Sequence, residues 1–233
     1  QKLDSVVMIQ CVDSREEPRN YFSRVCCPTT VKHALKLKKA NPQMAVYNHY
    51  RDKMTIGFTE NYFTAARKAG VIFIQYKPDN KPRVAVPTEA NTPLFITVTD
   101  PILNRPLEIE ADLLALATGI VPQLPATLAN AFAVQADQDG FFLEAESKWR
   151  PVDAIKEGVF GCGITFSPRS RPDPMATAGA AAQRALRILA HEKLSAGKIV
   201  ASVRHSLCSL CEKCIDTCPY HARYLDSDRG KIV

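Results

Sequence analysis

The first 76 residues alternate between two spacings of hydrophobic positions. Short apolar runs rich in β-branched residues are typical of buried strands, and apolar residues that recur every three or four positions are typical of helices. The strands are expected in DSVVMIQCV, AVYNHY and VIFIQY. The helices are expected in VCCPTTVKHALKLKKA, starting near Pro28 and Thr29, and in TENYFTAARKAG, with Thr59 as N-cap and Gly70 just past its end. Strands that alternate with helices in this way predict an α/β domain with a parallel sheet.

The remaining apolar runs predict a hairpin, three more strands and a long helix. PLFITVTD and RPLEIEA form the hairpin around the turn PILN. DLLALATGIVP is expected as a buried strand that ends in a Thr118-Gly119 turn, DGFFLEA as a short strand and GVFGCGITF as a glycine-punctuated strand. PDPMATAGAAAQRALRILAHEKL is expected as a helix with Asp173 as N-cap and Pro174 in the first turn.

Composition narrows the class of protein. With 46% hydrophobic residues among 233, the chain can form a substantial core. Its net charge of +6 is not concentrated in a basic tract, which argues against nucleic-acid binding. No run approaches about eighteen apolar residues, so no membrane span is expected, and the start has no pattern of an export signal. The sequence opens at Gln1 already in a strand-like pattern, so we expect a partial chain or one piece of a split protein.

The eight cysteines favour a reducing cytoplasm and metal ligation over disulfides. Four of them form the motif Cys208-x2-Cys211-x2-Cys214-x3-Cys218 followed by Pro219, the spacing with which bacterial ferredoxins bind 4Fe–4S clusters. Structural zinc more commonly takes two pairs of ligands with a longer spacer. No second set of cysteines follows, so we expect either that the natural chain continues or that one ligand is atypical.

Three further cysteines lie at the first strand–helix junction. Cys11 ends the strand, and Cys26 and Cys27 open the helix, where a dinucleotide-binding unit would carry its glycine-rich phosphate loop. A helix N-terminus favours thiolate over thiol, which suits metal ligation. The alternative is that these residues are small buried hydrophobes. Cys162, inside GVFGCGITF, is expected in the core.

Four segments in combination resemble the HdrA family, the iron–sulfur flavoprotein subunits of heterodisulfide reductase, and its relatives in electron-transfer complexes: IQCVDSREEPRNYFSRVCCPTTVKHALK, LLALATGIVP, GVFGCGITFSPRS and CSLCEKCIDTCPY. The resemblance implies part of a thioredoxin-reductase-like flavoprotein fold with two dinucleotide-binding lobes, and the start of a bacterial-ferredoxin-like module. The domains are then expected at 1–118 (nucleotide-binding-like, with the inserted cysteine cluster), 119–197 (FAD lobe) and 198–233 (first half of the ferredoxin-like module).

The resemblance also implies roles for particular residues. FAD would lie between the lobes, with the helix after Asp173 pointing at the flavin ring and Lys32 beside the flavin N5. Further FAD contacts are expected from the turn and loop residues Thr118, Gly119, Gly161, Gly163 and Ser167. The embedded cluster would be held by Cys11, Cys26 and Cys27.

Two features depart from the family pattern. Phe22 stands where the family has a fourth cysteine, so the embedded cluster is expected to be lost, reduced to three irons or completed by another group such as Asp13. The glycine-rich FAD phosphate loop G-x-G-x-x-G is also absent from the sequence, so an incomplete FAD site is expected.

The resulting functional hypothesis is an oxidoreductase subunit that relays electrons through FAD and a 4Fe–4S cluster, with bifurcation as a further expectation. The expected partners are other heterodisulfide-reductase-like subunits, hydrogenase or formate dehydrogenase modules, and ferredoxin. The alternative is a non-catalytic docking subunit with a degenerate flavoprotein fold. A pyridine-nucleotide oxidoreductase is disfavoured, because no glycine-rich loop precedes Val31.

Overall fold

The computed structural model describes residues 3–87, 92–193, 201–220 and 222–233. The chain divides into two compact units, residues 1–190 and 191–233. The expected domain boundary at 197/198 lies outside the described residues, and the expected boundary at 118/119 stays a prediction. None of the described helices combines the length and the apolar character that a membrane crossing requires.

A four-stranded parallel sheet organises the first unit. Its order is β3-β2-β1-β7, with β1 at Ser5–Ile9, β2 at Ala45–Tyr50, β3 at Ile72–Gln75 and β7 at Leu113–Leu116. Helix α1 (Cys26–Ala40) connects β1 to β2, and the short 3₁₀ helix η1 (Gly57–Thr59) with α2 (Glu60–Lys68) connects β2 to β3. The alternation of strands and helices that the sequence predicts, and the parallel sheet, are confirmed.

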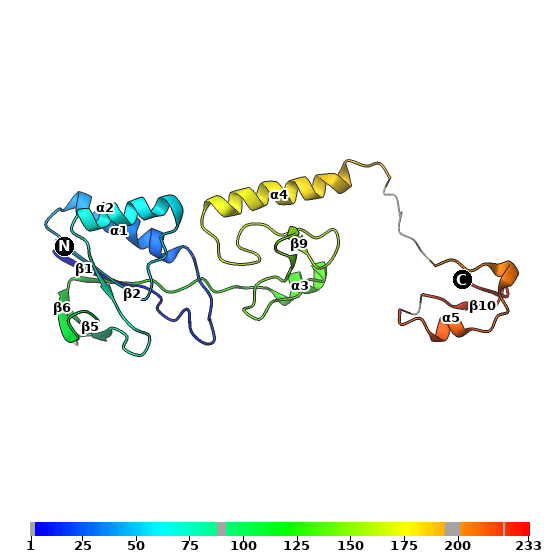
Figure 1. Ribbon diagram of the computed structural model, residues 1–233, viewed down its shortest axis with the longest axis horizontal. Helices are drawn as coiled ribbons and strands as arrows, with labels where there is room; N and C mark the ends of the chain where they lie inside the picture. Colours follow the sequence, from blue (N-terminus) through cyan, green and yellow to red (C-terminus); the bar gives the residue numbers. More distant parts are fainter. Residues whose placement is uncertain (1–2, 88–91, 194–200, 221) are drawn as a thin grey trace. The chain divides into compact units, whose positions relative to one another are not determined.

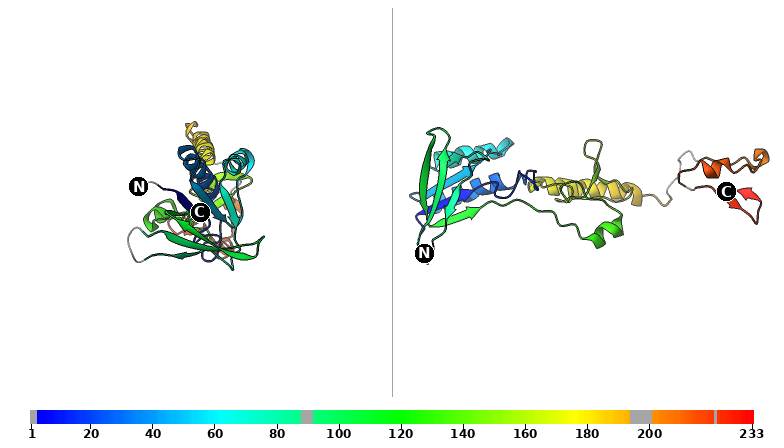
Figure 2. Two further views of the ribbon diagram at one scale, coloured as in Figure 1. Left: turned by 90° about the vertical axis from the view of Figure 1, so that its left-hand side faces the viewer. Right: turned by 90° about the horizontal axis from the view of Figure 1, so that it is seen from below.

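The two faces of this sheet are covered by different layers, as Figures 1 and 2 show. Val6 and Met8 of β1 pack on one face in a core cluster with Val31 and Ala34 of α1. Val7 points to the opposite face, because successive side chains of a strand alternate. That face packs against the predicted hairpin, whose strands β5 (Leu94–Asp100) and β6 (Arg105–Ala111) are antiparallel and extended by β4 (Arg83–Ala85).

A second region of the same unit holds the long helix. Helix α4 (Pro172–Leu189) is preceded by α3 (Ala126–Phe132) and by the hairpin of β8 (Glu144–Glu146) and β9 (Arg150–Ala154). The buried carboxylate of Asp153 on β9 pairs with Arg150, at 3.0 Å, and with Arg184 of α4. The second unit contains η2 (His205–Leu207), α5 (Lys213–Asp216) and the two-residue strands β10 (Leu225–Asp226) and β11 (Lys231–Ile232).

Two of the predicted strands are wrong in burial or in extent. The sequence predicts that β7 is buried, but Leu113 is 43% exposed and Leu116 is 51% exposed. Within the described part of the chain β7 pairs only with β1, so it forms a sheet edge with little cover. In DGFFLEA the strand begins only at Glu144, after a Phe142 bridge to Ala136.

The prediction of a strand in GVFGCGITF is also wrong. Residues 158–166 are irregular, with a turn at residues 163–164 and one bridge from Phe160 to Asp153. Gly158 and Gly163 adopt φ of 83° and 74°, which an extended strand does not accommodate. Cys162 therefore lies exposed in this irregular segment and not in the core.

Three predicted helix starts differ in detail. Helix α1 begins at Cys26, two residues before Pro28. Thr59 occupies the N-cap position of α2, but its hydroxyl donates to the Ile56 carbonyl at 2.8 Å and does not cap the helix. Asp173 lies in the first turn of α4, whose N-cap is Arg171, so the N-cap assignment is wrong. Offsets of one or two residues are common at helix ends, where capping geometry decides the boundary.

Because His49 is buried, we expect the folded state to lose stability at acidic pH. Its side chain is fully buried on β2, and neither ring nitrogen has a hydrogen-bond partner in the described part of the chain. Burial lowers the pKa of His49 from 6.5 to about 4. Between these pH values the unfolded chain binds a proton that the folded chain does not, so stability is complete above pH 6.5 and falls as the pH drops towards 4. The expected loss is about 3 kcal/mol.

Urea unfolding at a series of pH values measures this loss. His49→Gln removes the titrating group, so its stability is expected to change less with pH over the same interval. An equally steep decline in the variant would assign the acid sensitivity to other groups.

Candidate functional site

The junction between β1 and α1 brings the three N-terminal cysteines to the carboxyl end of the sheet. Cys11 follows β1, while Cys26 and Cys27 are the first residues of α1. The intervening loop is tightly turned, since Cys11, Asp13 and Arg15 all have φ between 54° and 64°. The loop therefore returns the chain to the end of the strand it has just left.

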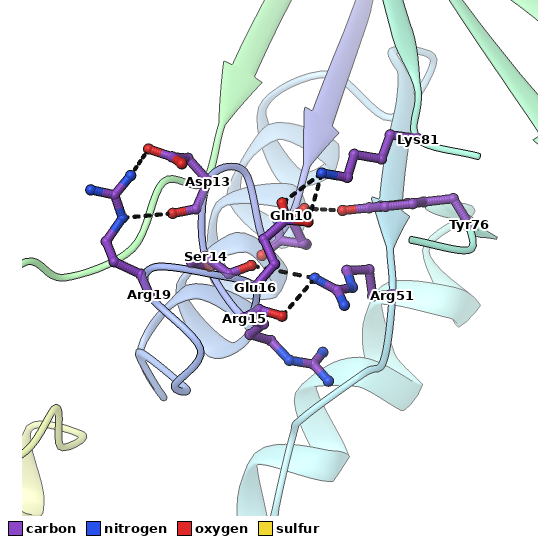
Figure 3. A network of polar contacts seen from close by, with 9 residues as sticks. All are labelled: Gln10, Asp13, Ser14, Arg15, Glu16, Arg19, Arg51, Tyr76 and Lys81. Atoms are coloured by element: carbon purple, nitrogen blue, oxygen red, sulfur yellow. Dashed lines mark hydrogen bonds and ion pairs between the residues drawn. The ribbon is translucent and has the colours of Figure 1, made fainter. Parts of the chain in front are cut away.

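Polar contacts from the segments that follow β2 and β3 fix this conformation, as Figure 3 shows. Arg51 donates to the carbonyls of Ser14 and Arg15 at 3.3 and 3.2 Å. Lys81 pairs with the Glu16 carboxylate at 2.6 Å, which lowers the pKa of Glu16. These contacts hold the loop from one side, while the Asp13–Arg19 ion pair lies on the other.

A small cavity, here called the thiol pocket, lies among these residues. Its volume is about 20 Å³, and its lining comprises Cys11, Ser14, Arg15, Phe22, Ser23, Arg24, Cys26, Cys27 and Met54. Burial raises the pKa of the Cys11 and Cys26 thiols, although the Arg15 guanidinium partly opposes this at Cys11. The Cys27 thiol is buried and donates to the Asp52 carbonyl at 3.8 Å. At Cys11 and Cys26 the pocket therefore favours the uncharged thiol.

The C-terminal motif presents a different environment. Cys214 lies in α5, and Cys208, Cys211 and Cys218 lie in the segments on either side of it. All four thiols are exposed or half-buried. A hydrogen bond from the Lys213 backbone amide is the main cause that lowers the pKa of Cys211. The Ala222 amide donates to Cys218 Sγ at 3.4 Å. Amide donors stabilise thiolates, so this donor set fits an iron–sulfur cluster.

In the described part of the chain, neither cysteine group has its side chains gathered as a metal site requires. In the ranges that the structure describes, no three His, Cys, Asp or Glu side chains are grouped so that they could hold a metal ion. The assignment of Cys208, Cys211, Cys214 and Cys218 as ligands stays a prediction, supported by donor chemistry and spacing.

A larger cavity of about 540 Å³ opens beside the first turn of α4. Apolar side chains, among them Phe22, Met54 and Ile56, form part of its wall, and the polar side chains of Ser170 and Asp173 belong to its α4 side. A flavin ring has apolar faces and a polar edge, and this lining fits it. The resemblance implied that the helix after Asp173 points at the flavin ring, and Asp173 lines this cavity. Phe22, Met54, Ile56 and Ser170 were not identified from the sequence as FAD-binding, because their spacing shows no motif and only the fold brings them together.

The six residues predicted to contact FAD do not share one cavity. Lys32 is exposed on α1. Thr118 and Gly119 line a separate cavity of about 340 Å³ with the Gln10 side chain, and Gly161, Gly163 and Ser167 lie in the turns before α4. The FAD roles of these residues stay predictions.

Gly161 has a structural role that a substitution can measure. A Cβ at this position would lie 2.5 Å from Cζ of the buried Phe166 ring, so Gly161→Ala forces the ring or the backbone to move. The expected cost is about 1–3 kcal/mol, measured by denaturant unfolding. Gly179→Ala in α4 is the matched control, because a Cβ there meets nothing within 4 Å and should stabilise the helix by about 0.5–1 kcal/mol. Equal effects would show that the Phe166 contact is unimportant.

Comparisons with solved structures identify the fold. Thioredoxin reductases from T. acidophilum and Lactococcus lactis each superpose with a TM-score of 0.50 and 15% identity, over 80% of this chain and 53% of theirs. This fold is the partial thioredoxin-reductase-like flavoprotein fold that the sequence predicts. No protein-family model matches the chain.

Comparisons with curated proteins identify the family. The HdrA subunit of the Methanosarcina acetivorans ferredoxin:CoB-CoM heterodisulfide reductase is 34% identical over 98% of this chain. The HdrA subunit of the Methanothermobacter marburgensis H(2):CoB-CoM heterodisulfide,ferredoxin reductase is 32% identical over 100% of it. The chain spans 28% and 35% of the lengths of these two relatives. Over the segment that it spans, the chain belongs to the HdrA family of heterodisulfide reductase subunits.

Proposed function

We propose that this chain is the flavin- and iron–sulfur-carrying part of an oxidoreductase subunit of the heterodisulfide reductase type, which relays electrons between partner subunits. The observation that carries the proposal is the 34% identity to a curated HdrA protein across 98% of the chain. FAD supplies two-electron chemistry with stable one-electron states, and iron–sulfur clusters pass single electrons. The protein contributes binding, polarity and hydrogen bonding around them.

The C-terminal motif supports the relay. Its four thiols have the spacing of a bacterial ferredoxin, and Leu210 and Glu212, on either side of Cys211, adopt positive φ of 55° and 57°. This turn presents the Lys213 amide to the Cys211 sulfur. Such amide contacts favour the thiolate, and amide–sulfur hydrogen bonds also tune the potential of a bound cluster.

The cavity beside α4 supports flavin binding. We propose that Phe22, Met54 and Ile56 contact the apolar face of the ring and exclude water from it. The first turn of α4 lies on the same cavity, and the positive end of a helix dipole stabilises negative charge nearby. Asp173 in that turn opposes part of this effect, so the site favours a flavin whose charge stays small.

The names of the relatives suggest partners. They specify ferredoxin in one case, and hydrogen or formate together with ferredoxin in others. We propose other heterodisulfide-reductase-type subunits, hydrogenase or formate dehydrogenase modules and ferredoxin as partners, with bifurcation as the finer version of the relay. A cytoplasmic location goes with this proposal, because free thiols and iron–sulfur ligands suit a reducing compartment.

A docking subunit without redox chemistry is the second candidate. Phe22 in place of a fourth ligand at the thiol pocket favours it. With this function the flavoprotein fold serves as a binding surface for partner subunits, and the cysteine motif takes no part in electron transfer.

Cofactor analysis of the full chain, purified without oxygen, distinguishes these functions. The relay predicts iron and acid-labile sulfide, a paramagnetic signal on reduction and flavin released on denaturation. A folded, colourless protein without iron, sulfide or flavin would contradict the relay and leave the docking function.

A further inference from the structure

We infer that the thiol pocket of this chain is closed by Arg15 stacked on Phe22 and holds no four-iron cluster. The two cysteine groups therefore differ in their expected iron content. If the chain carries iron for the relay proposed above, we expect that iron at the C-terminal motif. Three observations support the inference: the size of the pocket, the contacts of Arg15, and the side chains that lie near the three cysteines.

The first argument is space. The thiol pocket offers about 20 Å³ to a water-sized sphere, roughly the space that one water requires. A cluster of four irons and four sulfides is much larger than one water. The wall that Phe22, Arg24 and Met54 provide also belongs to the 540 Å³ cavity beside α4, so Phe22 stands between the two spaces.

The second argument is the position of Arg15. Its guanidinium carbon lies 4.0 Å from the centre of the Phe22 ring, a cation–π contact. The same group donates to Cys11 Sγ at 3.9 Å and pairs with Asp52 at 2.7 Å, and the Arg15 side chain is only 17% exposed. These three contacts hold the positively charged guanidinium beside the Cys11 sulfur and over the Phe22 ring, in the lining of the thiol pocket.

The third argument is that the other residues around the pocket do not supply a fourth ligand. Phe22 offers only carbon to the pocket, and Met54 offers an uncharged thioether. The Asp13 carboxylate is engaged by Arg19, as Figure 3 shows. The Ser23 hydroxyl accepts the Ile120 amide at 2.9 Å, so it too has a structural partner. Phe22, Met54, Asp13 and Ser23 are therefore engaged elsewhere or ligate iron poorly.

Iron and sulfide analysis of anaerobic full-chain variants tests the inference. Cys11→Ser is expected to leave iron per chain unchanged. Phe22→Cys supplies a fourth thiol and removes the ring on which Arg15 stacks, so it is expected to gain about four irons per chain after cluster reconstitution. Phe22→Ala opens the same space without adding a ligand and should gain none.

Thiol labelling gives a test without any substitution. In the native chain the half-buried Cys11 and Cys26 are expected to react with a small alkylating reagent equally fast before and after treatment with an iron chelator. Labelling that requires the chelator, or loss of about four irons in Cys11→Ser, would overturn the inference. No gain in Phe22→Cys would overturn the role assigned to Phe22.

These outcomes are distinct from failure of the proposed function. If the unsubstituted chain lacks iron at every site, the relay is contradicted, while the gain in Phe22→Cys still tests the pocket. If iron is present and Cys11→Ser loses it, the relay stands and the inference about the pocket fails.

Discussion

Replacing Cys211 with serine is expected to abolish iron binding at the C-terminal motif. The Cys211 thiol has a lowered pKa because the Lys213 amide donates to its sulfur, and it is the second ligand of the ferredoxin-like spacing. A serine hydroxyl at neutral pH does not replace a thiolate, so the loss of about four irons per chain and of the reducible paramagnetic signal is expected. Iron analysis and low-temperature electron paramagnetic resonance measure both.

The matched control is Cys162→Ser. Cys162 is also exposed, but it lies in the turns before α4 and outside both cysteine groups. Its replacement should leave iron content and signal unchanged. If Cys211→Ser retains full iron, or if Cys162→Ser loses as much, the motif is not the cluster site.

Replacing Ile96 with alanine is expected to cost about 2–5 kcal/mol of unfolding free energy. Ile96 is fully buried on β5, where it faces Ile109 of β6 and belongs to the cluster that joins the hairpin to Val7 and Ile9 of the parallel sheet. Truncation removes buried apolar surface and leaves a cavity between the two sheets, and the measured loss includes both effects. Urea unfolding followed by far-ultraviolet circular dichroism reports the change.

Ile102→Ala provides the control, because Ile102 lies in the turn of the same hairpin and is 90% exposed. Its replacement should change the unfolding free energy by no more than about 0.5 kcal/mol. A comparable loss in both variants would mean that the hairpin does not pack on the sheet through Ile96.

The α/β part of the fold follows closely from the sequence. Val6, Met8, Val31 and Ala34 have the strand and helix spacing that their burial requires, so periodicity identifies both elements and the faces that meet. The edge strand β7 shows the limit of this reasoning. Its leucines have the composition of a buried strand, but exposure depends on which neighbours pair with it, and one sequence segment does not contain that information.

The prediction for the turns before α4 is wrong for a local reason. Val159, Phe160 and Ile164 supply the apolar residues of a strand, whereas Gly158 and Gly163 adopt a positive φ that ends any extended run. The exposed position of Cys162 follows from the same error. A stronger weight on the glycines Gly158 and Gly163 would have favoured turns.

The candidate site is predictable in its cysteines and not in its surroundings. The positions of Cys11, Cys26 and Cys27 around the strand–helix junction indicate that they converge, and all three line one pocket. The placement of Arg15 over Phe22 is not predictable, because it depends on the path of a polar loop fixed by Arg51 and Lys81. The cavity beside α4 likewise combines residues from segments more than a hundred positions apart.

The order of the central sheet has a consequence for synthesis on the ribosome. Strand β1 pairs on one side with β2, but its other neighbour is β7, where Ile9 meets Leu116, and the Asp112 carboxylate accepts the amides of Asp4 and Ser5 at 2.8 Å. At translation rates of about 5–20 residues per second, the nascent β1 waits roughly 5–20 s for its second partner to emerge. During that interval one edge of an apolar strand is open to chaperones and to other nascent chains.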